Sequence, residues 1–333
     1  MKLAYKEYII RSKPINLIEK DNFLFKNEYE KIFEEVEIKC FNKIFILPNG
    51  IMFNKNFLFH EYFNSQISFF SKIKAFLKSL NCLFYFKSVT VINDGIIITD
   101  SSSSGFFHWF GDVLQKLEKL EINYKTYSRH SIVVPYIFDN SLSRETLSKY
   151  NFKIVFLKKN EVAKIIRAIY VPLISPTGNF RPQLMENLHN RFNITYQEKK
   201  NRIYISRSKA QKRRLINEDE IISFLVENHF TIINMEDYSF NEQIEILSKA
   251  DILVSIHGAA LTNMLWMPSG SKILEIRLKN DSVNNCYFSL ASSLELEYYY
   301  FLANPNDINK STQLTDFIID THNFKEQLKI LLN

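Results

Sequence analysis

Glycine is scarce in this chain, with seven among 333 residues, where globular proteins usually have about 7 %. No two glycines are separated by one residue, and none is followed by lysine. The G-x-G-x-x-G dinucleotide fingerprint and the G-x-x-x-x-G-K-[ST] phosphate loop are therefore both absent, which excludes two large classes of nucleotide enzymes. The three cysteines, Cys40, Cys82 and Cys286, are far apart and form no C-x-x-C pair. This argues against a disulfide framework or a zinc site and fits a reducing compartment.

Long apolar runs are also lacking. No stretch approaches the roughly 18 apolar residues of a transmembrane helix, and the chain begins without the apolar segment of a secretory signal. We therefore expect a cytoplasmic protein, and association with the inner face of the membrane stays open. Hydrophobic residues make up 46 % and charged residues 23 %, a balance typical of folded rather than disordered chains. At about 150 residues per domain, the length predicts two domains.

The first part of the chain has a mixed pattern. Hairpins are expected around Gly50, between residues 41–47 and 51–53, and around Gly95, between residues 89–92 and 96–99. Helix-spaced apolar residues predict helices over residues 67–80, 106–120, 143–150 and 182–192. Further strands are predicted over residues 132–134, 154–157 and 166–171.

From residue 199 onward, strands and helices alternate. Strands are predicted over residues 202–206, 231–235, 252–256, 272–276 and 297–301. Helices are predicted over residues 217–228, 239–250, 259–266 and 283–294, the first two with N-caps at Asn217 and Ser239. This alternation indicates a parallel sheet with helices on both faces. The predicted domains are residues 1–195 and 196–333, and packing of the last helix (324–332) back on the first domain stays open.

The segment from Val254 to Asn263 carries the clearest signal for a binding site. A buried strand ends at Ile256, and a helix starts two or three residues later, after His257 and Gly258. Ligands of open α/β sheets bind at the carboxyl ends of strands, where a helix start offers unpaired N–H groups to a phosphate. The alternative is a helix start with an incidental histidine.

Residues 199–214 contain eight lysines and arginines and no acidic residue. Arg207 follows a strand of the same predicted sheet as His257, and planar guanidinium groups there suit a diphosphate. A solvated basic loop is the alternative. Binding of nucleic acid is less favoured, because Tyr204 is the segment's only aromatic residue and lies within the strand.

His108 and Asp112 lie four residues apart in the predicted helix 106–120, so they share a face. One of them suits the role of general base, with the other as its partner; a solvated polar face is the alternative. Glu275 ends the strand after the His257 segment, where a carboxylate could bind ribose hydroxyls, although a surface glutamate is equally common there. No H-E-x-x-H or D-x-D pattern is present, so we expect no metal.

These residues resemble glycosyltransferase family 61. About a quarter of the chain matches densely, in the expected order and spacing. The amino-terminal marker is Gly105-x-x-His108-x-x-x-Asp112. The carboxyl-terminal ones are Tyr204-Ile205-Ser206-Arg207, Arg213-Arg214, Asn217-Glu218, Glu236, Ser239, Glu242-Gln243, Ala250-Asp251, His257-Gly258-Ala259-x-Leu261-x-Asn263, Pro268-x-Gly270 and Glu275.

The resemblance implies a GT-B architecture, with two Rossmann-like domains facing a cleft. The hairpins predicted above add extra β-structure to the first domain. It implies an inverting transferase that moves a sugar from a nucleotide sugar, commonly UDP-linked, to a glycan or lipid-linked glycan acceptor. Bacterial members of this kind serve capsule and other surface polysaccharides, and we expect this chain to be one of them. Neither a metal nor another cofactor is expected.

The residue pattern and the family resemblance together give the predicted site residues. Asp112 is preferred as the base, with His108 as its partner, and Gly105 and Trp109 are placed on the acceptor side. The residues expected to bind the nucleotide sugar are Arg207, Arg213, Arg214, His257, Gly258, Ala259, Thr262, Asn263 and Glu275. The alternative functions are a non-catalytic subunit that binds a nucleotide sugar or glycan and, less favoured, a nucleic-acid-binding protein.

Overall fold

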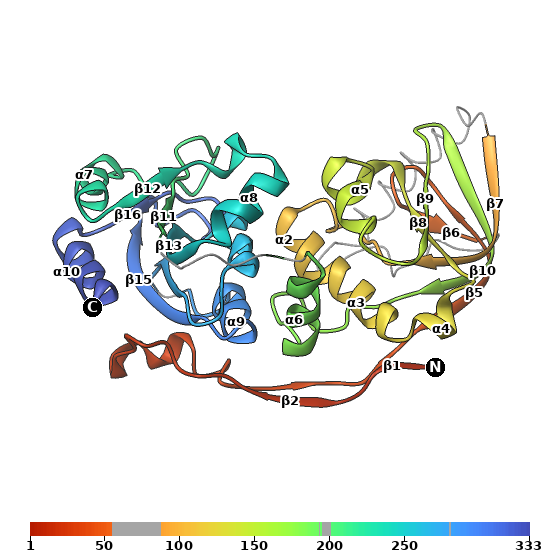
Figure 1. The fold of residues 1–333 in the computed structure, drawn as a ribbon, viewed down its shortest axis with the longest axis horizontal. Coiled ribbons are helices and arrows are strands. Elements are labelled where there is room, and N and C mark those ends of the chain that lie inside the picture. The colour runs from red at the N-terminus through yellow and green to blue at the C-terminus, as the bar shows by residue number, and fades with distance from the viewer. Residues whose placement is uncertain (55–87, 193, 195–200, 280) are drawn as a thin grey trace. The chain divides into compact units, whose positions relative to one another are not determined.

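The computed structural model describes residues 1–54, 88–192, 194, 201–279 and 281–333 (Figure 1). The chain forms two compact units. Unit 1 comprises Met1–Glu7 and Glu34–Thr177, and unit 2 comprises Tyr8–Phe33 and Gly178–Asn333. The predicted helix over residues 67–80, Cys82 and the predicted domain boundary between residues 195 and 196 lie outside the described residues.

Unit 1 is built on a six-stranded mixed sheet in the order β6-β5-β10-β7-β8-β9. Four parallel strands form one side: β7 (Ser88–Ile97), β8 (Ser131–Val134), β9 (Lys153–Phe156) and β10 (Glu161–Tyr170). The predicted hairpin around Gly50 is confirmed, since β5 (Lys39–Ile46) and β6 (Met52–Phe53) pair antiparallel and Gly50 has a φ of 87°. The short strands β1 (Lys2–Ala4) and β4 (Val36–Glu37) pair separately.

The predicted hairpin around Gly95 is wrong. Residues Ser88–Ile97 form the single strand β7, which pairs in parallel with β8 and β10. Gly95 lies inside that strand, and a Cβ there would come within 2.8 Å of the Ile165 side chain on β10. The glycine therefore makes room for packing between side chains, and an Asp-Gly pair alone does not distinguish that need from a turn.

Helices complete unit 1. One continuous helical segment consists of α2 (Phe106–His108), the π-helical turn η3 (Trp109–Val113) and α3 (Leu114–Ile122), which confirms the predicted helix. Elsewhere in the described part of unit 1 lie α4 (Tyr124–Tyr127), the 3-10 turn η4 (Tyr136–Phe138) and α5 (Ser141–Leu147). α5 begins with a capping box between Asn140 and Ser143.

Unit 2 carries the predicted parallel sheet, in the order β12-β11-β13-β14-β15-β16. The parallel strands are β11 (Asn201–Ile205), β12 (Phe230–Ile233), β13 (Ala250–Ile256), β14 (Lys272–Leu278) and β15 (Glu297–Pro305), and β16 (Phe317–Ile318) adds an antiparallel edge. The helical elements are α6 (Pro182–Arg191), α7 (Asp219–Glu227), η5 (Met235–Asp237), α8 (Phe240–Leu247), η6 (Ala259–Trp266), α9 (Cys286–Ser293) and α10 (Thr321–Leu332). The predicted α/β class is confirmed.

The helix caps of unit 2 follow the sequence only in part. Ser239 forms the expected capping box with Glu242 at the start of α8. Asn217, by contrast, is not the N-cap of α7: its side chain bonds to the backbone of Ile319, and Glu218 occupies the cap position. The Glu218 carboxylate instead accepts hydrogen bonds from Tyr204 and Ser206, at 2.7 and 2.8 Å.

The amino-terminal arm Tyr8–Phe33 belongs to unit 2. It contains all but the first residue of β2 (Glu7–Ile10), the strand β3 (Glu30–Phe33), which pairs with β2, and the 3-10 helix η1 (Glu19–Leu24). The Asn16 side chain bonds to both backbone groups of Tyr300 on β15, so the arm is fastened along that strand. The last helix, α10, packs on α7 and β15 within the same unit. Among the described residues, no helix combines the length and apolar character needed to cross a bilayer.

Candidate functional site

The strand order of unit 2 creates a topological switch point beside β11. From β11 the chain crosses to β12 on one side, and β13 then lies on the other side. The connections that leave the carboxyl ends of such neighbouring strands run in opposite directions, which opens a crevice for ligands. Arg207 follows the end of β11, and His257 and Gly258 follow the end of β13. The fold therefore brings together two sequence-predicted segments that lie 50 residues apart.

The side chain of Arg207 lies against the backbone of Gly258. A Cβ at position 258 would lie 2.9 Å from the Arg207 Cζ and would collide with Nη1. Gly258 has an extended backbone with a φ of 176°, which any residue can adopt, so the close approach of Arg207 and not the backbone conformation favours a glycine here. Arg207 is held there by hydrogen bonds from Nε to the Arg213 carbonyl (3.0 Å) and from Nη2 to the Lys212 carbonyl (3.3 Å).

Positive charge accumulates here without a paired carboxylate. Among the described residues, Arg207 forms no salt bridge, and the buried Nε of Arg213 has no hydrogen-bond acceptor. Burial, and then the like charge of Arg213, lowers the pKa of Arg207, although an arginine stays charged at neutral pH. The charge of Glu236 attracts Arg207 without forming a salt bridge with it. Two half-buried guanidinium groups without a salt bridge to a carboxylate can be stabilised by an anionic ligand.

His257 is oriented by a buried carboxylate. Its Nδ1 donates to Glu275, which is fully buried on β14 and also accepts a hydrogen bond from Tyr298 on β15. Burial alone would raise the pKa of Glu275, but His257, with help from Arg277 and Tyr298, lowers it below the ordinary value. Because Glu275 occupies Nδ1, the Nε2 atom of His257 is the ring nitrogen that remains to contact a ligand.

Arg277 links this buried network to the amino-terminal arm. Its guanidinium lies 4.8 Å from the ring centre of Phe25 and donates to Asn285 at 2.8 Å. Asn285 in turn donates to the Leu24 carbonyl at 2.9 Å. Sequence reasoning missed Arg277 and Tyr298. The spacing of Glu275 and Arg277 places both on one face of β14, and this was the signal available.

The other predicted nucleotide-binding residues have mixed surroundings. Ala259 starts η6, which is a 3-10 helix, and Thr262 is buried within it. Asn263 is 1 % exposed and bonds to Trp266 and Ala260 of the same helix. Arg214 is exposed and pairs with Asp316 at 3.5 Å. Glu275 lies inside β14 and not at its end, so the sequence-based placement of this residue was wrong.

In unit 1, His108 and Asp112 form a hydrogen-bonded pair. His108 Nδ1 donates to Asp112 Oδ2 at 2.7 Å, and the Thr177 hydroxyl donates to the same oxygen at 3.3 Å. The Asp112 side chain is 5 % exposed and that of His108 is 32 % exposed. The hydrogen bond to Asp112 raises the pKa of His108, partly opposed by burial. The helical spacing seen in the sequence therefore produces a real pair, with histidine as its accessible member.

Local backbone features hold this pair in place. Asp112 lies in the π-helical turn, an irregularity often found at functional positions. Gly105 precedes α2, and a Cβ there would lie 3.2 Å from the His108 ring. Trp109 is buried and donates to Thr146 at 2.9 Å, so its side chain belongs to the core of unit 1.

In neither unit do the described residues include a cluster of three or more His, Cys, Asp or Glu suited to a metal.

Fold and side chains together define an α/β protein with two half-buried arginines, Arg207 and Arg213, at the switch point of its parallel sheet. The sequence profile of the family Glycosyltransferase 61 matches residues 106–274, which is half of the chain. The matched stretch contains the His108–Asp112 pair, Arg207 and the His257–Gly258 segment. The chain belongs to the glycosyltransferase 61 family, and the resemblance drawn from the motifs is confirmed at that level.

The chain is also similar to proteins named EGF domain-specific O-linked N-acetylglucosamine transferase. Identity to the mouse protein is 30 % over 168 residues, which cover 46 % of this chain and 31 % of that protein. Identity to the fruit fly protein is 32 % over 167 residues, with the same coverage. Identity to the dog protein is 26 % over 219 residues, or 61 % of this chain and 37 % of that protein. The matches thus span about a third of the length of these curated relatives.

Proposed function

We propose that the chain is an inverting, metal-independent transferase that moves a sugar from a nucleotide sugar, most simply a UDP-sugar, to a hydroxyl group of a glycan or lipid-linked glycan. The observation that carries this proposal is the contact of Arg207 with Gly258 at the switch point, where cationic groups lack a carboxylate partner. Membership of the glycosyltransferase 61 family supports sugar transfer. The GT-B arrangement, a role in surface polysaccharide and a cytoplasmic location stay part of the proposal.

The relatives suggest the first donor to test. Their name specifies transfer of N-acetylglucosamine, so UDP-N-acetylglucosamine is our proposed donor. The EGF domain in that name describes the acceptor of those proteins. Because the matches cover only about a third of their length, we do not extend that acceptor to this chain.

Unit 1 supplies the base in the proposed reaction. His108 Nε2 takes the proton of the acceptor hydroxyl while the hydroxyl oxygen attacks the anomeric carbon, and Asp112 holds Nδ1. The exposure of His108 and the burial of Asp112 favour histidine as the base. The sequence-based prediction preferred Asp112 as the base and His108 as its partner. A buried carboxylate that orients an imidazole is a recurring way to place such a base.

Unit 2 stabilises the leaving group in the proposed reaction. As the bond between the anomeric carbon and the diphosphate oxygen breaks, its electron pair passes to the diphosphate. In this scheme Arg207, with Arg213 beside it, and the Nε2 atom of His257 compensate the developing charge. Fixed donors of this kind act where charge develops in the transition state, so a metal is not required in this scheme.

The direct test measures transfer and hydrolysis of UDP-N-acetylglucosamine in the presence of EDTA, with UDP binding measured in parallel. We expect the Arg207→Gln variant to lose about 10²–10³-fold in rate. Lys209→Gln is the matched control, because Lys209 lies in the same basic segment but pairs with Asp237. An Arg207→Gln rate equal to the control rate would remove Arg207 from the site, and strict dependence on Mn²⁺ would refute metal independence.

The two alternatives predict different results. A non-catalytic subunit would bind UDP or its sugars, show no turnover and be indifferent to changes at His108. A nucleic-acid-binding protein would use the basic segment after β11, but Lys209 is paired with Asp237 and Arg214 with Asp316. These ion pairs reduce the free positive charge of that segment and weigh against nucleic acid.

A further inference from the structure

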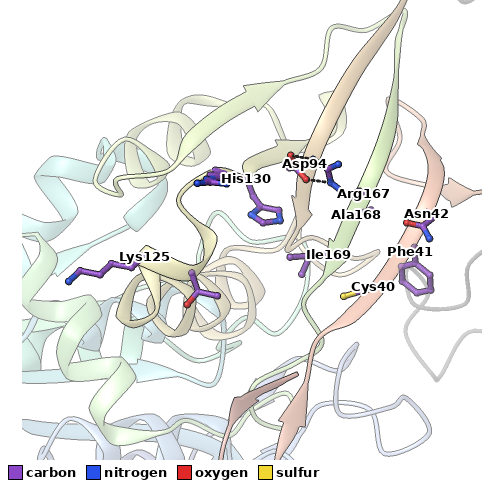
Figure 2. A pocket seen from close by; sticks show the side chains of 11 residues that line it. Cys40, Phe41, Asn42, Asp94, Lys125, His130, Arg167, Ala168 and Ile169 are labelled. Atoms are coloured by element: carbon purple, nitrogen blue, oxygen red, sulfur yellow. Dashed lines mark hydrogen bonds and ion pairs between the residues drawn. The ribbon is translucent and has the colours of Figure 1, made fainter.

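A pocket lies in unit 1 on residues other than the His108–Asp112 pair. It encloses about 620 Å³ and is lined by Cys40, Phe41, Asn42, Asp94, Lys125, Thr126, Arg129, His130, Arg167, Ala168 and Ile169 (Figure 2). Its volume falls in the range of small-molecule sites, roughly 300–1,000 Å³. None of these residues was singled out from the sequence as a binding residue.

One wall of the pocket is a face of the sheet. Arg167 on β10 is paired in register with Asn42 on β5 and with Asp94 on β7. Residues that are paired across neighbouring strands point to the same side, so these three side chains form a polar row. Arg167 donates twice to Asp94, at 2.5 and 2.6 Å, and this ion pair crosses the middle of the row (Figure 2).

The segment from α4 to β8 adds positive charge to the lining. It contributes Lys125 and Arg129, which are exposed, and His130. The pKa of Asp94 is lowered mainly by its hydrogen bonds with Arg167, and the charges of His130 and Arg129 contribute as well. The lining thus contains the cationic residues Lys125, Arg129 and Arg167 and one carboxylate, Asp94, so its formal charge is positive.

The lining of this pocket is distinct from the proposed base. Asp94 lies within β7, Arg167 within β10, and Arg129 and His130 precede β8. His108 lies in the helix that follows β7. The lining residues include neither His108 nor Asp112. A ligand in this pocket therefore lies outside the reacting centre that we propose.

We propose that this pocket binds a sugar-sized ligand that carries an oxyanion, either a phosphate or a carboxylate group. Lys125 and Arg129 attract the oxyanion, while Asn42 and Thr126 offer hydrogen bonds to hydroxyl groups. A single phosphate fills only a small part of the volume, which favours a larger molecule such as an acidic sugar. This inference goes beyond the proposed transfer reaction and does not depend on the donor site in unit 2.

Cys40 provides a local readout, because it lines the pocket and its thiol is exposed. The experiment measures the alkylation rate of Cys40 in the full-length chain by peptide mapping, with glucose 6-phosphate, glucuronate or neutral glucose. We expect the two acidic sugars to protect Cys40 from alkylation at concentrations about tenfold lower than glucose does. This ratio corresponds to the loss of one charge-assisted hydrogen bond. Vesicles of phosphatidylglycerol form a separate arm, in which protection by vesicles alone would assign the phosphate to a lipid headgroup.

Matched variants locate the effect. Arg129→Gln and Lys125→Gln change exposed side chains, and each should weaken protection about tenfold or more. Lys153→Gln, an exposed residue of unit 1 outside the pocket, removes the same charge and should leave protection unchanged. Equal protection by glucose, protection by none of the probes, or protection that survives both pocket variants would overturn the proposal. Failure of UDP to bind would count against the proposed transfer reaction alone.

Discussion

The guanidinium of Arg207 lies so close to Gly258 that a Cβ at this position would have to displace it. The two residues belong to loops that follow β11 and β13, so the contact lies at the switch point of the unit 2 sheet. A phosphate-binding loop rich in glycine is absent from this chain. One glycine and one arginine, joined across the sheet, provide a different way to present positive charge to an anion.

We predict that Gly258→Ala acts through Arg207. The added methyl group displaces the guanidinium, and UDP affinity should fall about tenfold or more, as for the loss of one charge-assisted hydrogen bond. Titration calorimetry on Gly258→Ala, Arg207→Gln and the double variant measures this effect. The double variant should bind no more weakly than Arg207→Gln, because both changes remove the same interaction. Additive losses would show that Gly258 acts independently.

The proposed base gives a pH prediction. Asp112 raises the pKa of His108, and a base must be unprotonated, so kcat/KM should rise with pH through an inflection above the ordinary histidine value of 6.5. Asp112→Asn removes the negative charge and should move that inflection to lower pH. His108→Asn should abolish it. A pH–rate profile that is unchanged by Asp112→Asn would contradict the pairing of these two residues in catalysis.

Tyr298 should stabilise unit 2 through its buried hydrogen bond to Glu275. Tyr298→Phe leaves one side of the carboxylate without a donor and should cost about 1–3 kcal/mol in urea unfolding. Tyr299→Phe is the neighbouring control, since its hydroxyl bonds to Glu297 at a long 3.4 Å. The control should change stability by no more than about 0.5 kcal/mol. Equal losses in both variants would argue against a special role for Tyr298.

Glu275 should also shape acid stability. Its pKa is lower in the folded chain than the ordinary value of 4.5, so folding favours the ionised form. This contribution is complete above that ordinary value and is lost as pH falls through the lowered folded-state pKa. Glu275→Gln should therefore be less stable than the parent at neutral pH and lose less further stability below pH of about 4.5. Glu227→Gln, on the exposed face of α7, is the control and should lose stability in acid as the parent does. If Glu275→Gln also loses as much stability in acid as the parent, the contribution assigned to Glu275 is wrong.

Periodicity and capping chemistry predicted much of unit 2. The alternation of apolar strands with amphipathic helices after residue 199 indicated a parallel sheet, and Ser239 with Glu242 marked the start of α8 correctly. The strand ends then placed Arg207 and the His257–Gly258 segment at one edge. These are local signals, because they depend on residues close together in the chain.

The errors arose where a residue serves a distant neighbour. Gly95 has the sequence context of a turn, yet it makes room for Ile165 on another strand. Asn217 has the sequence context of an N-cap, yet its side chain bonds to Ile319, about a hundred residues away. Trp109 was placed near the acceptor but packs into the core. The spacing of residues along the sequence does not predict contacts between residues so far apart in the chain.

By itself, the sequence determined the α/β class, the glycosyltransferase 61 family and the pairing of His108 with Asp112, since helical spacing alone brings residues four apart together. Only the tertiary structure decided that Glu275 is buried under His257, that Tyr298 and Arg277 support it, and that Gly258 faces Arg207. It also gathered Asp94, Arg129 and Arg167 around one pocket. The physical reason is that burial and charge pairing depend on strand order and register, which bring distant residues into contact.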